Sequence, residues 1–379
     1  MILHLVSDEK FTDESIALFE EINPGQNEFI IGVNSRSHKL NYVKKKEKVH
    51  IIEQKTKYYR KLAGNISKYE AVLVHYLDKY KAEIVVNSPP DVHFVWMLWG
   101  GDAYKLMGTQ LYDEITLSIL NKINRENIIK RNLRKVFVVD FLLNQKRRRK
   151  IERFFKAVRK IKFCTTVIPD DYKIITQKLP LRSLYIPFNY SGVKFIRLKQ
   201  ITNCARPEAS VLIGNSGDPS NNHISAFKLV EKLKSDKHKI IVPLSYGNRK
   251  YIEEVIKQGR TIFNKSFVPL TNFLSYNDYA KLLYGCQICF MDHYRQQGMG
   301  TIIILLWFGA KLYLRNNNPV YNYLRGNGIK VFSLDDDEIT LDSLGQLEKL
   351  SNKKIIGQMY DPELIKERAR NLVKLVTSH

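Results

Sequence analysis

The chain has 379 residues, of which 44% are hydrophobic and 26% charged. These proportions are typical of a folded globular protein and exclude a disordered one. One hydrophobic core rarely extends over this length, so we expect two domains. The formal net charge of +23 predicts an anionic partner, either nucleic acid, an anionic membrane or a phosphorylated substrate.

Short apolar runs alternate with helical patterns along the whole chain. The predicted strands are 2–6, 28–32, 50–53, 84–87, 93–99, 163–167, 183–186, 210–213, 239–243, 288–291, 311–314 and 331–332, while 136–139 fits a strand or a helix. The clearest helical patterns are 222–233, 249–258, 276–286 and 300–308. This alternation predicts α/β domains with parallel sheets that helices cover on both faces.

A linker at 190–207 separates two Rossmann-like doubly wound domains, predicted at 1–195 and 205–360. Residues 361–379 read as a basic amphipathic helix that packs back on the first domain, with Pro362 in its first turn. The stretch 301–314 is shorter than the about 20 apolar residues that a bilayer span needs, and the first residues lack a signal-peptide pattern. In doubly wound sheets, ligands bind beyond the carboxyl ends of strands, so the site residues should follow strands.

The first such segment is Val211–Asp218, followed by a helix start. Gly214 and Gly217 allow a tight turn and a close approach of the backbone to a ligand. Asn215 and Ser216 offer side-chain hydrogen bonds, and free N–H groups at a helix start favour anions. The alternative is an ordinary turn in which Asp218 or Ser220 caps the helix.

The second segment, Asp292–Thr301, is a glycine-rich loop between a buried strand and an apolar helix. Gly298, Gly300 and Thr301 predict a diphosphate cradle at the helix N-terminus. Arg295 supplies a cation suited to phosphate, while the amides of Gln296 and Gln297 suit sugar hydroxyls.

The third segment ends an aromatic strand with Gly100, Gly101 and Asp102. A carboxylate in this place is a candidate catalytic base or a ligand for hydroxyl groups, although it also fits a helix cap. His4, Asp8 and His75 lie at or near strand ends in the same half and are secondary candidates.

Basic residues gather in 144–162, where Phe154, Phe155, Val158 and Ile161 recur at helical spacing, and in Lys44–Lys48 and Lys55–Lys61. A helix of this kind can lie on an anionic membrane, with its apolar stripe against lipid or against its own core. The alternative is a solvated surface. No helix-turn-helix, zinc-finger, KH or RRM signature accompanies the charge, so nucleic acid is not expected.

Cys286 and Cys289 form a C-x-x-C pair in an apolar stretch. A second pair at zinc-site spacing is missing from the sequence, so a metal is not expected here. Buried structural thiols in a reducing cytosol are the better interpretation.

These segments together resemble the family 56 glycosyltransferases. Trp99–Tyr104 resembles the family's Trp-Gly-Ala-Asp-Leu-Tyr, and residues 214–224 resemble Gly-Asn-Ser-Gly-Asp-x-Ser-Asn-x-His-Ile. Residues 295–301 resemble Arg-Gln-Gln-Gly-Ile-Gly-Thr. The similarity is long and specific from about 210 to 325, where Pro243 and Tyr246 also match, and thin before Trp96. Asp292 and His293 replace apolar family positions.

The resemblance implies a GT-B fold with two Rossmann-like domains facing a cleft, and a metal-independent glycosyltransferase reaction. The donor would be a dTDP-sugar carrying Fuc4NAc (4-acetamido-4,6-dideoxy-D-galactose) or a related fucose-like sugar, as in enterobacterial common antigen synthesis. The acceptor would be a polyprenyl-diphosphate-linked glycan at the inner face of a bacterial plasma membrane. GDP-fucose as the donor, and a non-catalytic nucleotide-sugar-binding or nucleic-acid-binding protein, are the alternatives.

The resemblance also suggests roles for single residues. Asp102, His75 and Arg295 are expected to be catalytic. The residues expected to bind the donor are Gly214, Asn215, Ser216, Asp218, Pro243, Tyr246, Tyr276, Gln296, Gln297, Gly298, Gly300 and Thr301.

Overall fold

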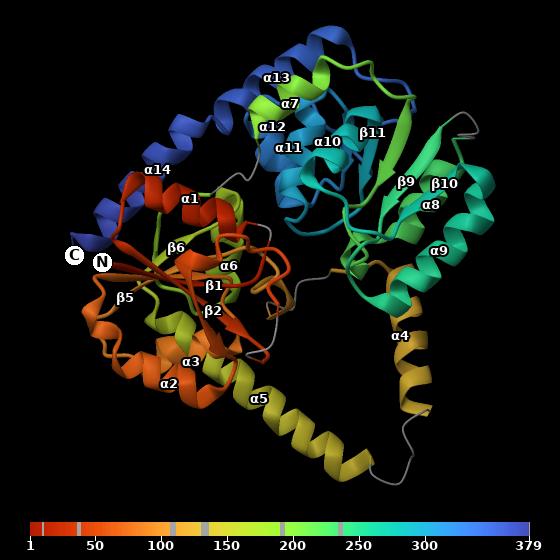
Figure 1. Cartoon of the computed structure of the whole chain (residues 1–379). Coiled ribbons are helices and arrows are strands. Elements are labelled where there is room, and N and C mark those ends of the chain that lie inside the picture. The colour runs from red at the N-terminus through yellow and green to blue at the C-terminus, as the bar shows by residue number, and fades with distance from the viewer. Residues whose placement is uncertain are drawn as a thin grey trace. The chain divides into compact units, whose positions relative to one another are not determined.

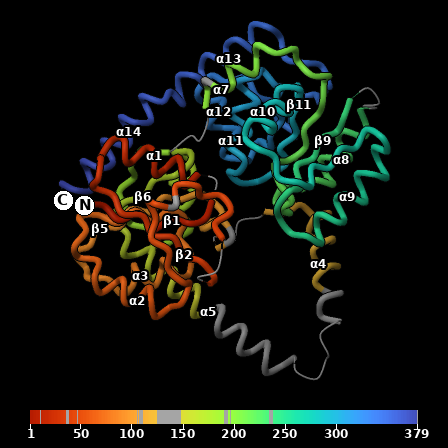
Figure 2. Tube along the Cα trace, in the orientation of Figure 1, coloured from red at the N-terminus to blue at the C-terminus, as the bar shows by residue number. Residues whose placement is uncertain are grey.

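The computed structural model describes residues 1–9, 11–35, 39–106, 111–129, 136–189, 194–233 and 238–378. The chain divides into two units (Figure 1 and Figure 2). Unit 1 comprises Met1–Thr109, Lys135–Gly192 and Asp361–His379, and unit 2 comprises Gln110–Arg134 and Val193–Tyr360. The predicted boundaries differ from this division, because they place residues 110–134 in the first domain.

Unit 1 is built on a seven-stranded parallel sheet with the order β3-β2-β1-β4-β5-β6-β7. Strands β2 and β3 lie on one side of β1, and β4 and the later strands lie on its other side. The switch point of the sheet is therefore between β1 and β4. The strands are β1 (Ile2–Val6), β2 (Asn27–Val33), β3 (Val49–Glu53), β4 (Ala71–His75), β5 (His93–Met97), β6 (Phe163–Thr165) and β7 (Leu184–Tyr185).

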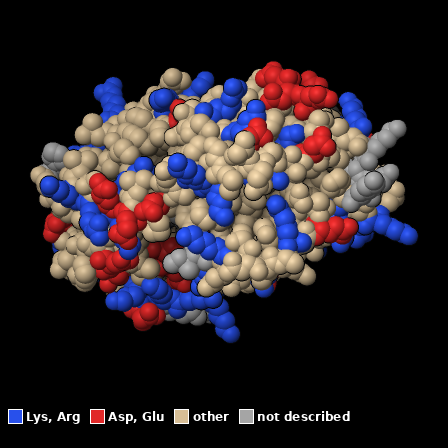
Figure 3. Space-filling view, turned by 90° about the horizontal axis from the view of Figure 1, so that it is seen from above, with Lys and Arg blue, Asp and Glu red and all other residues tan. Residues whose placement is uncertain are grey.

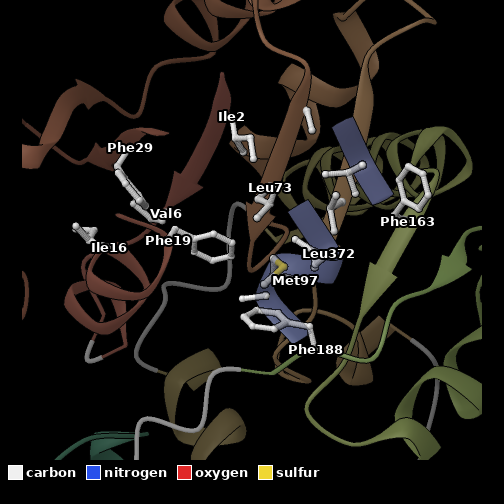
Figure 4. Packing of buried hydrophobic residues seen from close by; sticks show 14 of the residues in the cluster. Ile2, Val6, Ile16, Phe19, Phe29, Leu73, Met97, Phe163, Phe188 and Leu372 are labelled. Atoms are coloured by element: carbon white, nitrogen blue, oxygen red, sulfur yellow. The ribbon is translucent and has the colours of Figure 1, made fainter. Parts of the chain in front are cut away.

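Helices cover both faces of this sheet (Figure 1). On one face α1 packs against α14, and on the other α3 packs against α2 and α5. Leu372 of α14 belongs to the same hydrophobic cluster as Met97 and Phe188 (Figure 4), so the end of the chain completes the core of unit 1. The helices are α1 (Thr12–Ile22), α2 (Thr56–Gly64), α3 (Lys79–Asn87), α5 (Val136–Lys160), α6 (Pro169–Lys178) and α14 (Pro362–Thr377).

Unit 2 repeats this topology with a six-stranded parallel sheet in the order β10-β9-β8-β11-β12-β13, whose switch point lies between β8 and β11. Its strands are β8 (Ser210–Ile213), β9 (Lys239–Pro243), β10 (Phe267–Leu270), β11 (Cys286–Met291), β12 (Lys311–Leu314) and β13 (Phe332–Ser333). Its helices are α4 (Glu114–Ile129), α7 (Phe195–Thr202), α8 (His223–Glu231), α9 (Arg249–Phe263), α10 (Tyr276–Gly285), α11 (Met299–Trp307), α12 (Pro319–Gly326) and α13 (Gln346–Met359). No helix in the described parts of either unit is long and apolar enough to cross a membrane.

The strand predicted at 84–87 is wrong, because these residues end helix α3. Asp78 caps that helix by accepting the N–H groups of Tyr80 and Lys81. This cap favours a helix for the apolar run that follows it. The central strand β4 was not predicted, nor was β10, and 136–139 lies in α5. Short apolar runs in buried strands and helices look alike in the sequence, which explains these differences.

Candidate functional site

The predicted donor-binding residues gather at one edge of the sheet of unit 2. Residues 214–218 follow β8, residues 243–246 end and follow β9, and residues 292–301 follow β11. Tyr276 begins α10 after β10, and its hydroxyl accepts the N–H of Lys194 at 3.0 Å. The strands concerned are neighbours in the order β10-β9-β8-β11, so these loops share the edge at which doubly wound sheets bind ligands.

The loop after β8 is held from within by Asn221, which is fully buried. Asn221 Oδ1 accepts the N–H of Asn215 at 2.9 Å, and its Nδ2 donates to the carbonyls of Ser216 and Asp218, both at 3.0 Å. Sequence reasoning did not single out Asn221, although it lies in the stretch that carries the family resemblance. These hydrogen bonds fix the backbone from which Asn215 projects.

Gln297 joins this loop to the one after β11. Its Nε2 donates to Asn215 Oδ1 at 3.3 Å, and its Oε1 lies 2.7 Å from the hydroxyl of Ser220. Asp218 Oδ1 accepts the N–H of Ser220 at 3.0 Å and so caps the short turn Pro219–Asn221. The alternative interpretation was that Asp218 or Ser220 caps the following helix. Asp218 caps this short turn instead, and the N-cap of α8 is Asn222.

The loops after β8 and β9 touch through two glycines. The N–H of Gly217 donates to the carbonyl of Tyr246 at 2.7 Å, and the N–H of Asn248 donates to the carbonyl of Gly217 at 3.0 Å. A Cβ atom on Gly247 would lie 2.2 Å from the carbonyl carbon of Gly217, so only glycine allows this approach. Tyr246, 46% exposed, is thereby held beside the loop after β8.

Gly298 is the N-cap residue directly before helix α11, and its φ of 69° favours glycine. A Cβ atom there would come within 3.0 Å of Asn215 Cγ, whereas one on Gly300 would meet open space. Among the described residues no side chain caps this helix start. Its first N–H groups therefore point, with the positive end of the helix dipole, toward space that an anion can enter.

Two further side chains stand at this helix start. Thr301 Oγ1 lies 3.3 Å from the hydroxyl of Tyr279, and burial raises the pKa of Tyr279, which keeps that phenol neutral. Gln296 is 3% exposed, and within the described part of the chain its Oε1 has no hydrogen-bond partner. A buried acceptor of this kind is costly unless a ligand or water donates to it.

Arg315 forms ion pairs with two aspartates near the donor-site loops. It bonds the buried Asp292 through Nε at 2.5 Å and Nη2 at 3.2 Å, and Asp335 through Nη1 at 2.6 Å. Burial raises the pKa of Asp292 to about 7, although the bonds to Arg315 oppose the shift. Arg295 is half-buried and donates from Nη1 to the carbonyl of Gln296 at 2.9 Å.

His293 is a neutral imidazole with a fixed tautomer. Burial is the main cause that lowers its pKa to about 3, and Arg295 adds to it. Asn318 Oδ1 accepts the N–H of Val320 at 2.9 Å, so its Nδ2 donates to His293 Nδ1 at 3.1 Å. The proton of His293 is therefore on Nε2.

Asp102 in unit 1 is 6% exposed and has both oxygens engaged. Oδ2 accepts from the N–H of Leu77 at 3.0 Å and from Trp96 Nε1 at 2.8 Å, and Oδ1 accepts from the N–H of Trp99 at 3.2 Å. Burial raises its pKa, and these hydrogen bonds oppose the shift. These contacts make Asp102 a positioning residue that fixes the ends of β4 and β5, and its catalytic or acceptor-orienting role stays a prediction.

His75 is likewise buried in unit 1. Its Nε2 lies 3.2 Å from His4 Nδ1, and His4 Nε2 lies 3.2 Å from Asn27 Oδ1. Burial lowers the pKa of both imidazoles, that of His4 to about 3. Both rings are thus neutral parts of a hydrogen-bonded chain, which favours a structural role over the predicted catalytic one for His75.

Asp8, the remaining secondary candidate, accepts the N–H groups of Asn41, Tyr42 and Val43 at 2.6–3.1 Å. It therefore anchors the loop between β2 and β3.

The apolar stripe of the basic helix α5 faces its own core. Phe154, Val158 and Ile161 are buried and Phe155 is half-buried, while the exposed side chains are Arg148, Arg149, Lys150, Glu152, Lys156 and Arg159. The side chains of residues 144–147 and of Lys46 lie outside the described part of the chain. Figure 3 shows Lys and Arg side chains spread over the visible face, with acidic groups between them. In the described part of α5, from Arg148 on, the exposed side chains are therefore all charged.

The two cysteines of the C-x-x-C pair are buried in β11, and burial raises the pKa of both thiols. They are thiols at physiological pH, which fits a structural role. In the part of the chain that the structure describes, no three His, Cys, Asp or Glu side chains form a group that could hold a metal ion.

Comparisons with known proteins agree on the class. The family described as 4-alpha-L-fucosyltransferase, glycosyl transferase group 56, matches residues 135–375, more than half of the chain. A sucrose-phosphate synthase from Thermosynechococcus elongatus is similar in structure, with a TM-score of 0.61, 8% identity, and coverage of 100% of this chain and 99% of that one.

Two further solved structures are similar. HepE from Anabaena in complex with UDP has a TM-score of 0.61 and 10% identity, with 98% of this chain and 99% of that one covered. A UDP-forming trehalose-phosphate synthase from Burkholderia xenovorans has a TM-score of 0.54 and 8% identity, with 100% and 96% covered. With the two parallel sheets, these likenesses show the GT-B fold predicted from the sequence.

Proposed function

Because this chain belongs to glycosyltransferase group 56, we propose that it transfers a fucose-like deoxy-amino sugar from a dTDP-sugar to a polyprenyl-diphosphate-linked glycan. The chain is a glycosyltransferase of the GT-B fold. The observation that carries the donor site is the open start of α11, where Gly298 packs on Asn215 and Gln297 bonds the same side chain.

In this proposal the diphosphate of the donor lies at the start of α11. The N–H groups of Met299, Gly300 and Thr301 neutralise its charge together with the helix dipole. Arg295 stabilises the negative charge that develops on the leaving diphosphate, a contribution that is often the largest in such chemistry. Gln296, whose Oε1 has no partner among the described residues, accepts a hydrogen bond from a sugar hydroxyl.

The nucleobase lies at the ends of β9 and β10, where two aromatic rings are exposed. Tyr246 is 46% and Phe273 58% exposed. Tyr246 follows β9, which is next to β8, and Phe273 follows β10, which is next to β9. An aromatic ring stacks on any base, so base identity is set by the polar groups around it. HepE from Anabaena, which shares the fold, is in complex with UDP, so UDP belongs among the nucleotides to be tested.

In this proposal the acceptor binds to unit 1 while the protein lies at a membrane. The group 56 description names a fucosyltransferase, which supports a fucose-like sugar. The exposed cations of α5 and the net charge of +23 support attraction to anionic lipid and to a phosphorylated acceptor.

The experiment is a transfer assay with the full chain and lipid-linked glycans extracted from bacterial membranes. It compares dTDP-Fuc4NAc, GDP-fucose and UDP-glucose as donors, with chelator present throughout, and measures the nucleoside diphosphate released. Acceptor-dependent release of dTDP alone is the expected result. Release of GDP or UDP alone would overturn the proposed donor, and no release from any donor would overturn the proposed transfer.

A further inference from the structure

Three aromatic side chains meet beyond the carboxyl ends of β1, β4 and β5 in unit 1. Phe11 starts α1, Tyr76 directly follows β4, and Trp99 follows β5. The ring of Trp99 lies 6.0 Å from that of Phe11 and 5.9 Å from that of Tyr76, both in edge-on contact. The cluster thus spans the switch point between β1 and β4, the position at which doubly wound sheets bind ligands.

The backbone at Tyr76 is strained. Its φ of 62° lies in the left-handed region, which is unfavourable for a bulky residue. Such strain costs on the order of 1–3 kcal/mol and persists where the surroundings enforce it, often at ligand sites. Here the strain turns the chain sharply at the end of β4, and the ring of Tyr76 packs on Gly101.

Two buried charged residues enforce this conformation. Lys81, 3% exposed, donates from Nζ to the carbonyls of His75 at 2.6 Å and Tyr76 at 3.1 Å, and to Ser7 Oγ at 2.8 Å. On the other side Asp102 accepts the N–H of Leu77. Burying a charged group is costly unless it is well hydrogen-bonded. Their shared effect is to hold Tyr76 where its ring meets Trp99.

The rim of the cluster beside Phe11 is polar. Asp8 accepts the N–H groups of residues 41–43, and Asp13 accepts those of Lys44 and Lys45 at 3.0–3.2 Å. Since Asp8 and Asp13 flank Phe11 in the sequence, they bind the loop 41–45 beside it. Phe11 itself is 38% exposed. Tyr76 and Trp99 are half-buried. A partly exposed aromatic surface with a polar rim suits a ligand that has both an apolar face and polar groups.

We infer that Phe11, Tyr76 and Trp99 form a platform on which a sugar ring of the acceptor glycan stacks. The C–H groups on one face of a pyranose ring carry partial positive charge and pack on the negative face of an aromatic ring. The hydroxyl groups at the ring edge then meet the polar rim. This inference deepens the proposed function, on which it rests, by naming the surface of unit 1 that recognises the acceptor.

The test uses saturation-transfer NMR, which detects sugar protons close to protein protons. The probe is the water-soluble glycan mixture that mild acid releases from bacterial lipid-linked oligosaccharides, added to the full chain. Phe11→Ala and Trp99→Ala should weaken glycan binding by roughly 2- to 10-fold each, the range for one aromatic contact. Trp99→Phe should retain most of the binding, because a ring remains.

Leu184→Ala serves as the matched control, since Leu184 is a large apolar side chain of unit 1 that is 63% exposed on β7. Its glycan binding should equal that of the wild type. Wild-type affinity in both Phe11→Ala and Trp99→Ala, or no glycan signal with the wild type, would overturn the platform.

Thermal stabilisation by nucleoside diphosphates, measured on the same variants, separates this result from a failure of the donor site. It should be unchanged in all of them. Loss of nucleotide stabilisation in Trp99→Ala would instead assign the aromatic cluster to the nucleobase and would contradict the inference.

Discussion

Gln297 donates a hydrogen bond from Nε2 to Oδ1 of Asn215 at 3.3 Å. This contact joins the loops that follow β8 and β11, on either side of the switch point of unit 2. It fixes Asn215 against Gly298, at the start of the helix that we propose binds the donor diphosphate.

Replacing Gln297 by Ala should weaken nucleoside diphosphate binding by about 2- to 12-fold, the value of one neutral hydrogen bond. Isothermal titration with the nucleotide that binds the wild type measures this effect. Gln258→Ala is the control, because Gln258 bonds only Glu254 within helix α9 among the contacts described. Equal affinity of Gln297→Ala and the wild type would show that the contact does not organise the site.

Gly300→Ala should change stability and affinity in opposite directions. Gly300 is helical and faces open space, so alanine should stabilise the free protein by about 0.5–1 kcal/mol. The added methyl group would occupy the space in which the diphosphate is proposed to lie. Thermal unfolding with and without nucleotide measures both effects, and a higher melting temperature with undiminished nucleotide stabilisation would place the diphosphate elsewhere.

Gly298→Ala is expected to destabilise the free protein. Alanine in the left-handed conformation costs about 1–2 kcal/mol, and its Cβ would press on Asn215. Thermal unfolding of the free variant checks this, and a melting temperature equal to that of the wild type would contradict the tight packing of Gly298.

Asp102→Asn should unfold at a lower temperature, because the amide nitrogen cannot accept from the donors that now bond both carboxylate oxygens. An unsatisfied buried donor costs about 1–3 kcal/mol. Turnover at a temperature where the variant is folded then separates the two roles. Full stability with abolished turnover would restore Asp102 as a catalytic carboxylate.

Stability should fall as the pH drops below 6.5. Burial lowers the pKa of His4, His223 and His293 from 6.5 to about 3, so each unfolded imidazole binds a proton that the folded one excludes. Their stabilising contribution is complete above pH 6.5 and is lost progressively toward pH 3. Each of these histidines should lower the free energy of unfolding by about 1 kcal/mol as the pH falls from 6.5 to 5.5. Denaturant unfolding across this range measures the loss, and a flat profile would contradict neutral burial.

The exposed cations of α5 should bind anionic vesicles. The triple variant Arg148→Glu, Arg149→Glu and Lys150→Glu should weaken sedimentation with vesicles that contain phosphatidylglycerol, and added salt should weaken the wild type in the same way. Neutral phosphatidylcholine vesicles are the control. Equal binding of the wild type to both vesicle types would contradict electrostatic docking.

The sequence predicted most strands of both sheets and the loops that carry the proposed donor-binding residues. It did so because an apolar run followed by glycine, asparagine and serine is a local pattern that marks the end of a strand and a turn. Strand β4 was missed, since its run Ala71–His75 differs little from the apolar end of α3. The roles of Lys81 and Asn221 were not predictable in this way. Each depends on acceptors in other segments, such as Ser7 for Lys81, and pairing across the fold leaves no periodic signal in the chain.

The buried contacts of Asp102 and His75 were not predicted, for a related reason. A polar residue at a strand end looks the same in the sequence whether it faces a ligand or closes a buried hydrogen-bond network. Only the partners, Trp96 for Asp102 and His4 for His75, distinguish the two cases.

The central claim is that the start of α11 holds the diphosphate of a nucleotide sugar. Thermal unfolding of the full chain with dTDP, UDP, GDP, CDP and ADP, in the presence of chelator, tests it most directly. A nucleotide at a hundred times its dissociation constant adds about 2.7 kcal/mol of stability. We predict a clear stabilisation by dTDP that is reduced in Gln297→Ala and Gly300→Ala, whereas the absence of stabilisation by any of the five nucleotides would contradict the site.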